Sequence, residues 1–295
     1  MGWLQPRINL LEKYMTKEIK KISSGHNACA GCGQLSAVQS VMRALDKNTI
    51  IANATGCLEV TTTAYPQSAW GLPWIHSLFE NPAAVATGIS AALKKRGEKK
   101  TKVVVMAGDG GTFDIGMGII SGMWERKEDI LYICYDTESY SNTGFQASGA
   151  TPYGASTSTS PKGDKNKCQK IKTCDSVNEI GNEYQKKDMI KIALAHDVPY
   201  VAQSTAGYPN DIFNKVKKAL TMKGPGYIQI LSPCIPGWKI KTNETVELGK
   251  LANLSNFYPL LEYVNGQLIS GGLNSEKDAK KFKQEYLGKQ GRFKD

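Results

Sequence analysis

The sequence has no long apolar run. None of its 295 residues lie in a stretch of about 18 consecutive hydrophobic side chains, the length that a membrane-spanning helix requires. The first residues, Met1-Gly-Trp-Leu-Gln-Pro-Arg7, lack a basic region followed by an apolar stretch and a cleavage site, so we expect no secretory leader. Internal repeats and low-complexity tracts are absent as well. We therefore expect a cytoplasmic protein with no membrane partner.

The composition has no strong bias either. Hydrophobic residues make up 41% of the chain and charged residues 22%. This balance allows a large core and argues against disorder, collagen-like repeats and a small disulfide-stabilised module. The length equals about two average domains, but α/β chains of this size often form one unit with appendages.

The net charge of +10 lacks the pattern of a nucleic-acid surface. No run of five basic residues occurs, and aromatic residues do not interleave with the lysines as they do on a base-stacking platform. Nearly all of the excess comes from residues 1–21, 162–187 and 276–295, which each carry a net charge of +3. We interpret these segments as solvated surface, with an acidic protein partner as the alternative, and expect no nucleic acid.

The hydrophobic pattern alternates between helices and strands. We expect helices over 34–47, 81–93, 116–126, 186–196 and 209–222, and strands over 49–53, 102–107, 129–135, 199–203 and 226–231. Because the strands are almost continuously apolar, both of their faces are expected to be covered. The predicted fold class is α/β, a mostly parallel sheet with helices on both faces.

Two stretches break this alternation. Residues 136–182 are polar and rich in Gly, Ser, Thr and Asn, and they are too long for a passive connection in a compact domain, so we expect a functional loop. The part after Ser232 contains Pro233, Pro236 and Pro259 and ends in a lysine-rich tail. We expect it to be an irregular extension that wraps or docks.

Four of the seven cysteines form a candidate metal site. Cys29 and Cys32 lie in a Cys-x-x-Cys loop flanked by glycines, Cys57 follows Ala54-Thr-Gly, and Cys234 lies in Ser232-Pro-Cys-Ile-Pro236. Four thiolates suit an iron–sulfur cluster or zinc, and a Cys-x-x-Cys pair alone also occurs in thiol redox sites. The spacing leaves a cluster, zinc and unrelated thiols open.

The other three cysteines have no metal-motif spacing. Cys134 lies inside a predicted strand and is expected to pack in the core. Cys168 and Cys174 lie among lysines, where surface thiols are the default interpretation and a regulatory disulfide is the alternative.

A second candidate site lies where two predicted strands end. Asp109 in Gly108-Asp-Gly110 follows one strand, and Thr137 follows the next strand 28 residues later. Glycines at such a turn let backbone amides approach phosphates, and an aspartate there can hold a divalent cation. Ligands bind at the carboxyl ends of strands in open α/β sheets. The pattern therefore predicts one magnesium ion with a diphosphate.

These motifs together resemble the β subunits of the 2-oxoacid:ferredoxin oxidoreductases, thiamine-diphosphate enzymes, and among them the pyruvate synthase branch. Over about residues 20–240, the resemblance is carried by Gly25-His-Asn-Ala-Cys29-Ala-Gly-Cys32-Gly, Ala54-Thr-Gly-Cys-Leu-Glu-Val60, Pro73-Trp-Ile-His76, Gly108-Asp-Gly-Gly-Thr-Phe-Asp-Ile-Gly116, Asp136-Thr-Glu-Ser-Tyr-Ser-Asn142-Thr-Gly, Thr151-Pro-Tyr-Gly154 and Ser232-Pro-Cys234. Most thiamine enzymes have asparagine where this chain has Thr137, and Thr137 matches this branch.

The resemblance implies a fold, a division of the chain and a role for each motif. It implies the thiamine-diphosphate-binding fold, with an N-terminal arm over 1–24, the cofactor-binding domain over 25–240 and a C-terminal extension over 241–295. Mg²⁺ is expected at the Asp109 and Thr137 side chains and the Ser139 carbonyl. The diphosphate is expected at Gly108, Gly110, Gly111 and Thr112, the thiazolium and substrate carboxylate at Asn142, and a [4Fe–4S] cluster at Cys29, Cys32, Cys57 and Cys234.

The implied activity is that of one subunit of a larger enzyme, which converts pyruvate, coenzyme A and oxidised ferredoxin to acetyl-CoA, CO₂ and reduced ferredoxin. The alternatives in the same family are oxalate, a branched 2-oxoacid and 2-oxoglutarate. The chain lacks a second thiamine half and a Cys-x₂-Cys-x₂-Cys-x₃-Cys ferredoxin pattern. We therefore expect it to be inactive alone and to need an α subunit with the pyrimidine-side domain, a γ subunit and a ferredoxin-like δ subunit.

One alternative comes from a different class of function. It is a zinc-stabilised nucleotide-binding module whose basic segments dock nucleic acid. Brown, anaerobically purified protein that absorbs near 400 nm would favour the enzyme, and a colourless zinc protein with intact ligands would contradict it.

Overall fold

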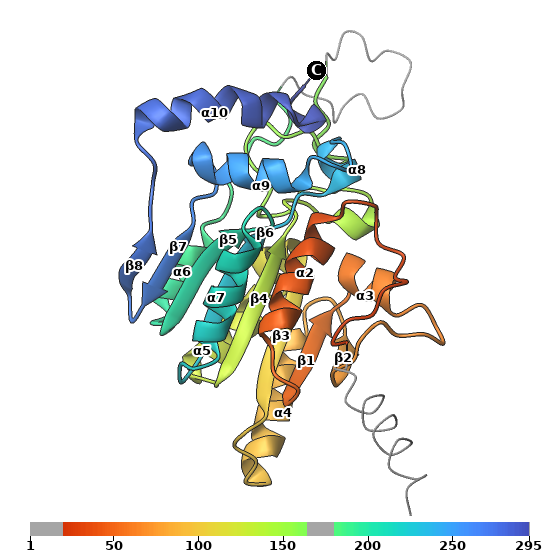
Figure 1. Cartoon of the computed structure of the whole chain (residues 1–295), viewed down its shortest axis with the longest axis vertical. Coiled ribbons are helices and arrows are strands. Elements are labelled where there is room, and N and C mark those ends of the chain that lie inside the picture. Colours follow the sequence, from red (N-terminus) through yellow and green to blue (C-terminus); the bar gives the residue numbers. More distant parts are fainter. Residues whose placement is uncertain (1–19, 164–179, 295) are drawn as a thin grey trace, which may run out of the picture.

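The computed structural model describes residues 20–163 and 180–294, and an eight-stranded sheet forms its centre (Figure 1). The strands are β1 (Thr49–Ala54), β2 (Trp74–Ser77), β3 (Lys102–Gly108), β4 (Ile130–Asp136), β5 (Tyr200–Thr205), β6 (Gly226–Leu231), β7 (Leu261–Val264) and β8 (Gln267–Gly271). Their order is β2-β1-β3-β4-β6-β5-β7-β8. The first six strands along this order pair in parallel, and β7 and β8 pair antiparallel.

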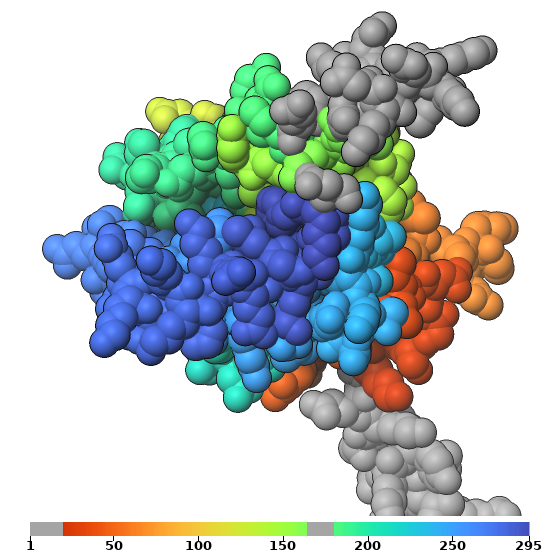
Figure 2. Space-filling model, turned by 90° about the horizontal axis from the view of Figure 1, so that it is seen from above, coloured from red at the N-terminus to blue at the C-terminus, as the bar shows by residue number. Residues whose placement is uncertain are grey.

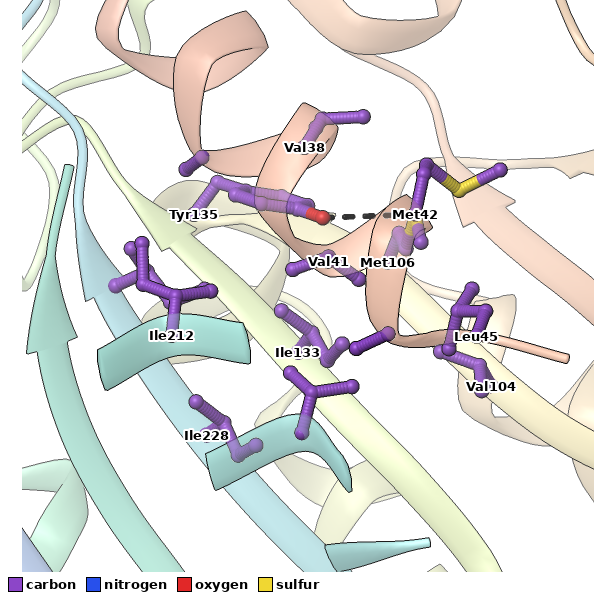
Figure 3. Close-up of a cluster of buried hydrophobic side chains, with 14 of the residues drawn as sticks. Val38, Val41, Met42, Leu45, Val104, Met106, Ile133, Tyr135, Ile212 and Ile228 are labelled. Carbon is purple, nitrogen blue, oxygen red and sulfur yellow. Dashed lines mark hydrogen bonds between the residues drawn. The ribbon is translucent and has the colours of Figure 1, made fainter. Parts of the chain in front are cut away.

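Helices cover both faces of the sheet, as the continuous apolar strands predict. One face carries α2 (Gly33–Ala44) and α7 (Pro209–Ala219), and the other carries α4 (Pro82–Lys95), α5 (Met117–Glu125) and α6 (Met189–Ala195). Every residue of β4 is buried because this central strand is covered from both sides. Figure 3 shows the α2 face of the core, where Val38, Val41, Met42 and Leu45 pack toward Val104, Met106 and Ile133.

The carboxy-terminal part of the chain differs from the expected irregular extension. It forms α8 (Ile235–Trp238), α9 (Thr245–Leu254), the strands β7 and β8, and α10 (Glu276–Gly288). Leu231, Trp238, Leu248 and Tyr286 belong to a third buried cluster that joins this part to the end of β6. The expectation of irregular structure is wrong because the segment adds two strands to the sheet and three helices above it.

The C-terminal helices cover the edge at which the parallel strands end. Figure 2, which looks down on this edge, shows the dark blue C-terminal segment beside the light blue α8–α9 region, with the red N-terminal loop next to them. The cofactor motifs follow strands that end at this edge, so these helices lie on the same side of the sheet as the motifs.

Several expected features lie partly or wholly outside the described residues. Most of the expected N-terminal arm over 1–24 lies there, and so do Cys168 and Cys174. None of the helices within residues 20–163 and 180–294 combines the length and the apolar character that a membrane span needs.

Candidate cofactor site

A pocket opens at the carboxyl ends of β1, β3 and β4, where the sequence predicts the cofactor. Its wall is formed by the residues that follow these strands, by the start of α2 and by the loop after β4. The lining residues are Gln34, Asn53, Ala54, Thr55, Gly56, Cys57, Leu58, Phe79, Ala107, Gly108, Asp109, Gly110, Thr137, Ser139, Tyr140, Ser141, Asn142 and Thr143. Six of the eight positions expected to bind thiamine diphosphate or Mg²⁺ are among them.

Asp109 is the buried acid of this pocket, with only 1% of its surface exposed. Its Oδ1 accepts hydrogen bonds from the Thr137 amide at 3.1 Å and the Thr137 hydroxyl at 2.8 Å, and its Oδ2 accepts one from the Ser148 hydroxyl at 2.5 Å. Burial, together with the nearby charge of Asp136, raises the pKa of Asp109 to about 7. A cation at the carboxylate would offset both effects and favour the ionised form.

The Thr137 hydroxyl lies between the other two expected Mg²⁺ ligands. It is 2.8 Å from Asp109 Oδ1 and 3.1 Å from the Ser139 carbonyl oxygen, and it also accepts a hydrogen bond from Ser141 at 2.9 Å. The Thr137 hydroxyl has one proton, so it can donate to only one of these two oxygens at a time. Adjacent ligands of an octahedral Mg²⁺ ion at 2.0–2.1 Å are about 2.9 Å apart. The Thr137 hydroxyl therefore lies from each of the other two oxygens at a distance that suits neighbouring ligands of this ion.

The glycine turn after β3 is a π-helical turn, η1 (Gly110–Asp114), which the sequence did not specify. A Cβ on Gly110 would lie 2.4 Å from the Tyr140 ring, and one on Gly111 would lie 2.9 Å from the Phe79 carbonyl oxygen. Thr112 is fully buried, and its hydroxyl donates to the Gly108 carbonyl oxygen at 2.7 Å. Gly111 and Thr112 are therefore not part of the pocket lining, and the Thr112 side chain points into the core.

Asn142 lies at the exposed mouth of the pocket, on the short 3₁₀ helix η2 (Ser141–Thr143). The loop that carries it is held at its base by Tyr140, whose amide donates to the Gln146 carbonyl oxygen at 2.9 Å. The Tyr140 hydroxyl donates to Asp114 at 2.9 Å, and its ring stacks on Phe79 with centroids 5.8 Å apart. Asn142 is thus exposed on an anchored loop.

The structure brings together the loops that carry the four candidate cysteines. The Cys32 amide donates to the Cys29 carbonyl oxygen at 3.0 Å, and the Gly33 amide donates to the carbonyl oxygen of Pro233, the neighbour of Cys234, at 3.2 Å. Cys57 begins α3 (Cys57–Thr62), a short helix that the sequence did not predict.

The thiols of these cysteines affect one another. Burial raises the pKa of Cys57 to about 12, and the charges of Cys234, Cys32 and Cys29 add to the effect. Among residues 20–163 and 180–294, no three His, Cys, Asp or Glu side chains are arranged to hold a single metal ion. The four cysteines are neighbours, and their role as ligands stays a prediction. Cys134 is buried in β4, as expected.

The contact between two cysteine loops depends on Gly33, which gives a first prediction. A Cβ at this position would lie 2.6 Å from the Pro233 backbone nitrogen. We expect Gly33→Ala to lower the free energy of unfolding by about 1–3 kcal/mol, because the two loops must separate to admit the methyl group. Thermal and denaturant unfolding of the full-length chain measures this change.

The matched control is Gly88→Ala in α4, where a new Cβ meets nothing within 4 Å. Alanine favours the helix over glycine by about 0.5–1 kcal/mol, so this variant should be as stable as the wild type or slightly more stable. Equal losses in both variants would show that the loop contact is not the cause.

The sequence patterns did not predict a network of charged residues that holds the Thr137–Ser139 loop. Lys186 lies 2.5 Å from Asp136 and 2.8 Å from Glu138, and Arg292 lies 2.5 Å from the other carboxylate oxygen of Glu138. Burial opposes ionisation of Glu138, but Lys186 and Arg292 hold its pKa below the usual range. No sequence signal pairs these residues, because Arg292 is 154 positions away from Glu138.

Comparison with known proteins identifies the family. Residues 54–230 match the family model of the thiamine pyrophosphate enzyme C-terminal TPP-binding domain. Pyruvate synthase subunit PorB of Methanocaldococcus jannaschii is 46% identical over 277 residues, which cover 92% of this chain and 88% of that protein. This chain belongs to the PorB family of 2-oxoacid:ferredoxin oxidoreductase subunits.

Other oxidoreductase subunits are nearly as similar. Pyruvate synthase subunit PorB of Methanothermobacter marburgensis is 45% identical over 273 residues, which cover 92% of this chain and 89% of that protein. Ketoisovalerate oxidoreductase subunit VorB of Pyrococcus abyssi is 40% identical over 276 residues, which cover 92% and 84%. Family membership confirms that the chain is part of an oxidoreductase and favours this interpretation over a zinc-stabilised nucleotide-binding module.

A solved structure has the same fold. The 2-oxoglutarate:ferredoxin oxidoreductase from Magnetococcus marinus, with 2-oxoglutarate, coenzyme A and succinyl-CoA bound, superposes with a TM-score of 0.61 at 20% identity. The match covers 92% of this chain and 91% of that one. The predicted fold class, a mostly parallel α/β sheet of the thiamine-diphosphate-binding type with helices on both faces, is confirmed.

Proposed function

We propose that this chain is the thiamine-diphosphate-binding β subunit of a pyruvate synthase. The complete enzyme would convert pyruvate, coenzyme A and two oxidised ferredoxins to acetyl-CoA, CO₂, two reduced ferredoxins and a proton, and the reaction is reversible. The relatives that match at 44–46% identity are named pyruvate synthase subunits, which supports pyruvate over other 2-oxoacids.

The observation that carries this proposal is the lining of a single pocket. Asp109, Thr137 and Ser139 line it together with Cys57, so the candidate diphosphate–magnesium site and a candidate cluster ligand face one space. Oxidation of a 2-oxoacid by ferredoxin needs carbanion chemistry next to an acceptor of single electrons. Bound thiamine diphosphate would supply the first and a [4Fe–4S] cluster the second.

The residues of this chain would hold and orient the cofactor. The Asp109 carboxylate, the Thr137 hydroxyl and the Ser139 carbonyl oxygen would bind Mg²⁺, and Gly108 and Gly110 would approach the diphosphate through their backbone. Gly111 and Thr112 do not line the pocket, so they would contact the diphosphate through their backbone amides and not through the Thr112 hydroxyl.

The remaining predicted residues have roles at the pocket mouth and at the cluster. Asn142 would donate its side-chain amide to the substrate carboxylate, which its exposed position on an anchored loop allows. The thiolates of Cys29, Cys32, Cys57 and Cys234 would hold the cluster.

We also propose that the chain works only with its partner subunits. Large apolar side chains are exposed near the motifs of the pocket, including Val60, Tyr65 and Leu78, which are 48%, 97% and 64% exposed. Such exposure is typical of a surface that another protein covers. The α, γ and ferredoxin-like δ subunits, with ferredoxin and coenzyme A, would complete the enzyme.

The proposal predicts a substrate preference that one assay can measure. The complete, anaerobically purified complex should reduce a viologen dye at least about tenfold faster with pyruvate than with 2-oxoisovalerate, 2-oxoglutarate or oxalate, judged by kcat/KM. The rate should depend on coenzyme A and on thiamine diphosphate. Preference for 2-oxoisovalerate would instead place the complex beside the VorB relative, which is 40% identical.

A further inference from the structure

The Thr137–Ser139 loop has its middle residue in an unfavourable backbone conformation. Glu138 has φ of +60°, a left-handed geometry that costs energy for a residue with a Cβ atom, and only 5% of its surface is exposed. This geometry turns the loop so that the Thr137 hydroxyl and the Ser139 carbonyl oxygen lie on the same side, 3.1 Å apart. Something outside the loop must hold Glu138 in place.

Arg292, near the end of the chain, holds this loop at two points. Its guanidinium lies 2.5 Å from one carboxylate oxygen of Glu138 and stacks on the Trp238 ring, with its central carbon 3.8 Å from the ring centroid. The Trp238 indole donates to the Thr137 carbonyl oxygen at 2.9 Å. Arg292 thus supports the Glu138 side chain directly and the Thr137 backbone through Trp238.

The position of Arg292 is itself fixed. It is 2% exposed, its Nε donates to Gln290 at 2.9 Å, and its carbonyl oxygen accepts a hydrogen bond from the Ser156 amide at 2.7 Å. Arg292 is not among the residues that line the pocket. Its effect on the site must therefore pass through Glu138 and Trp238.

The charges around Glu138 are balanced only when Arg292 is present. Asp136 and Glu138 face Lys186 and Arg292, two acids against two bases. Without Arg292, Lys186 would be the only basic side chain paired with these two buried carboxylates, and the loop would lose a contact that opposes its backbone strain. The loop would then populate conformations in which the Thr137 and Ser139 oxygens point apart.

We propose that Arg292 is a positioning residue of the cofactor site, which arranges the Thr137 hydroxyl and the Ser139 carbonyl oxygen beside the Asp109 carboxylate. The inference rests on the proposed function, in which these oxygens bind the magnesium ion of thiamine diphosphate. It gives the C-terminal segment a part in forming the site, although that segment contributes no residue to the pocket wall.

The test measures binding of Mn²⁺ with thiamine diphosphate to the complete complex, stripped of its cofactor. Partners that orient a metal ligand typically contribute 10–100-fold to metal affinity. We expect Arg292→Met to raise the Mn²⁺ dissociation constant about 10–100-fold, with kcat at saturating Mn²⁺ and thiamine diphosphate within about threefold of the wild type. Arg292→Lys keeps the charge without the planar stacking, so it should restore part of the affinity.

A second readout does not depend on the cofactor. Amide hydrogen exchange in residues 136–142 of the cofactor-free complex should be faster in Arg292→Met than in the wild type, because the loop loses its support. Trp238→Phe removes the N–H donor to Thr137 and leaves a smaller ring for Arg292 to stack on, and it should show a smaller change in the same direction.

The control is Lys289→Met, which removes a half-buried basic residue whose ion-pair partners, Glu247 and Glu285, are exposed. It should change neither the dissociation constant nor the exchange. An Arg292→Met complex with wild-type affinity and wild-type exchange would overturn the proposal. If that variant does not assemble, wild-type values for both Arg292→Lys and Trp238→Phe would overturn it. If the wild type binds no Mn²⁺ with thiamine diphosphate, the proposed function fails, and exchange alone decides the role of Arg292.

Discussion

Asp109→Asn is expected to abolish tight binding of magnesium thiamine diphosphate to the complete complex. The asparagine keeps the shape of the side chain and an oxygen that can accept from Thr137, but it removes the only charge among the three expected ligands. We expect the affinity for thiamine diphosphate at fixed Mg²⁺ to fall at least about 100-fold, equal to ~2.7 kcal/mol, with a comparable loss of kcat/KM. Titration of the cofactor-free complex, followed by fluorescence and by recovery of activity, measures both.

The same substitution should not weaken the fold in the absence of cofactor. The pKa of Asp109 is raised to about 7 in the folded chain, mainly by burial. A raised pKa means that the unfolded state releases this proton more readily, so ionisation of Asp109 opposes folding at neutral pH. Asparagine removes this opposition. Cofactor-free Asp109→Asn should therefore unfold at a temperature equal to or above that of the wild type, while its cofactor binding is lost.

The matched control is Asp129→Asn. Asp129 is exposed and its carboxylate lies 3.7 Å from Lys102 on the surface, so losing its charge should change neither binding nor stability by more than about 0.5 kcal/mol. If Asp109→Asn bound thiamine diphosphate as tightly as the wild type, the magnesium assignment would be wrong.

Cys57→Ser is expected to remove electron transfer while leaving thiamine diphosphate binding in place. A hydroxyl is a poor substitute for a thiolate ligand. Cys57 lies close enough to the other three cysteines for their charges to raise its pKa. We expect loss of the absorbance near 400 nm, a lower iron content and a fall in viologen reduction of at least about 100-fold. Thiamine diphosphate affinity should stay within about threefold of the wild type, because Asp109, Thr137 and Ser139 are unchanged.

Cys134→Ala is the control for Cys57→Ser. Cys134 is also a free cysteine, but it is buried within β4 in the core, and replacement should leave the absorbance and iron content unchanged. A colourless wild-type complex with one zinc ion per chain would contradict the cluster. So would a Cys57→Ser complex with full iron content and full activity.

The central part of the fold could be predicted because its signals are local. The strands β1, β3, β4, β5 and β6 are short, almost continuously buried runs, which only a sheet covered on both faces explains. Strand β2 was missed because it has four residues, two of them exposed. Strand β8 was missed because all five of its residues are exposed, so it has no apolar pattern.

The candidate site likewise contains residues that the sequence could predict and residues that it could not. Asp109 and Thr137 could be predicted together because each follows a buried strand, and parallel neighbours end at one edge. Ser148, Trp238 and Arg292 could not, because their contacts with the site loops join residues 39, 101 and 154 positions apart. Only the packing of the C-terminal segment above the sheet brings the last two to the loop.

The proposed magnesium site is tested most directly by a structure of the complete, anaerobically purified complex with thiamine diphosphate and Mn²⁺ in place of Mg²⁺. Anomalous scattering locates the metal independently of the protein density. We expect a manganese peak about 2.1 Å from the Asp109 carboxylate, the Thr137 hydroxyl and the Ser139 carbonyl oxygen, in contact with the diphosphate. A diphosphate bound elsewhere, or a manganese peak away from these three oxygens, would contradict it.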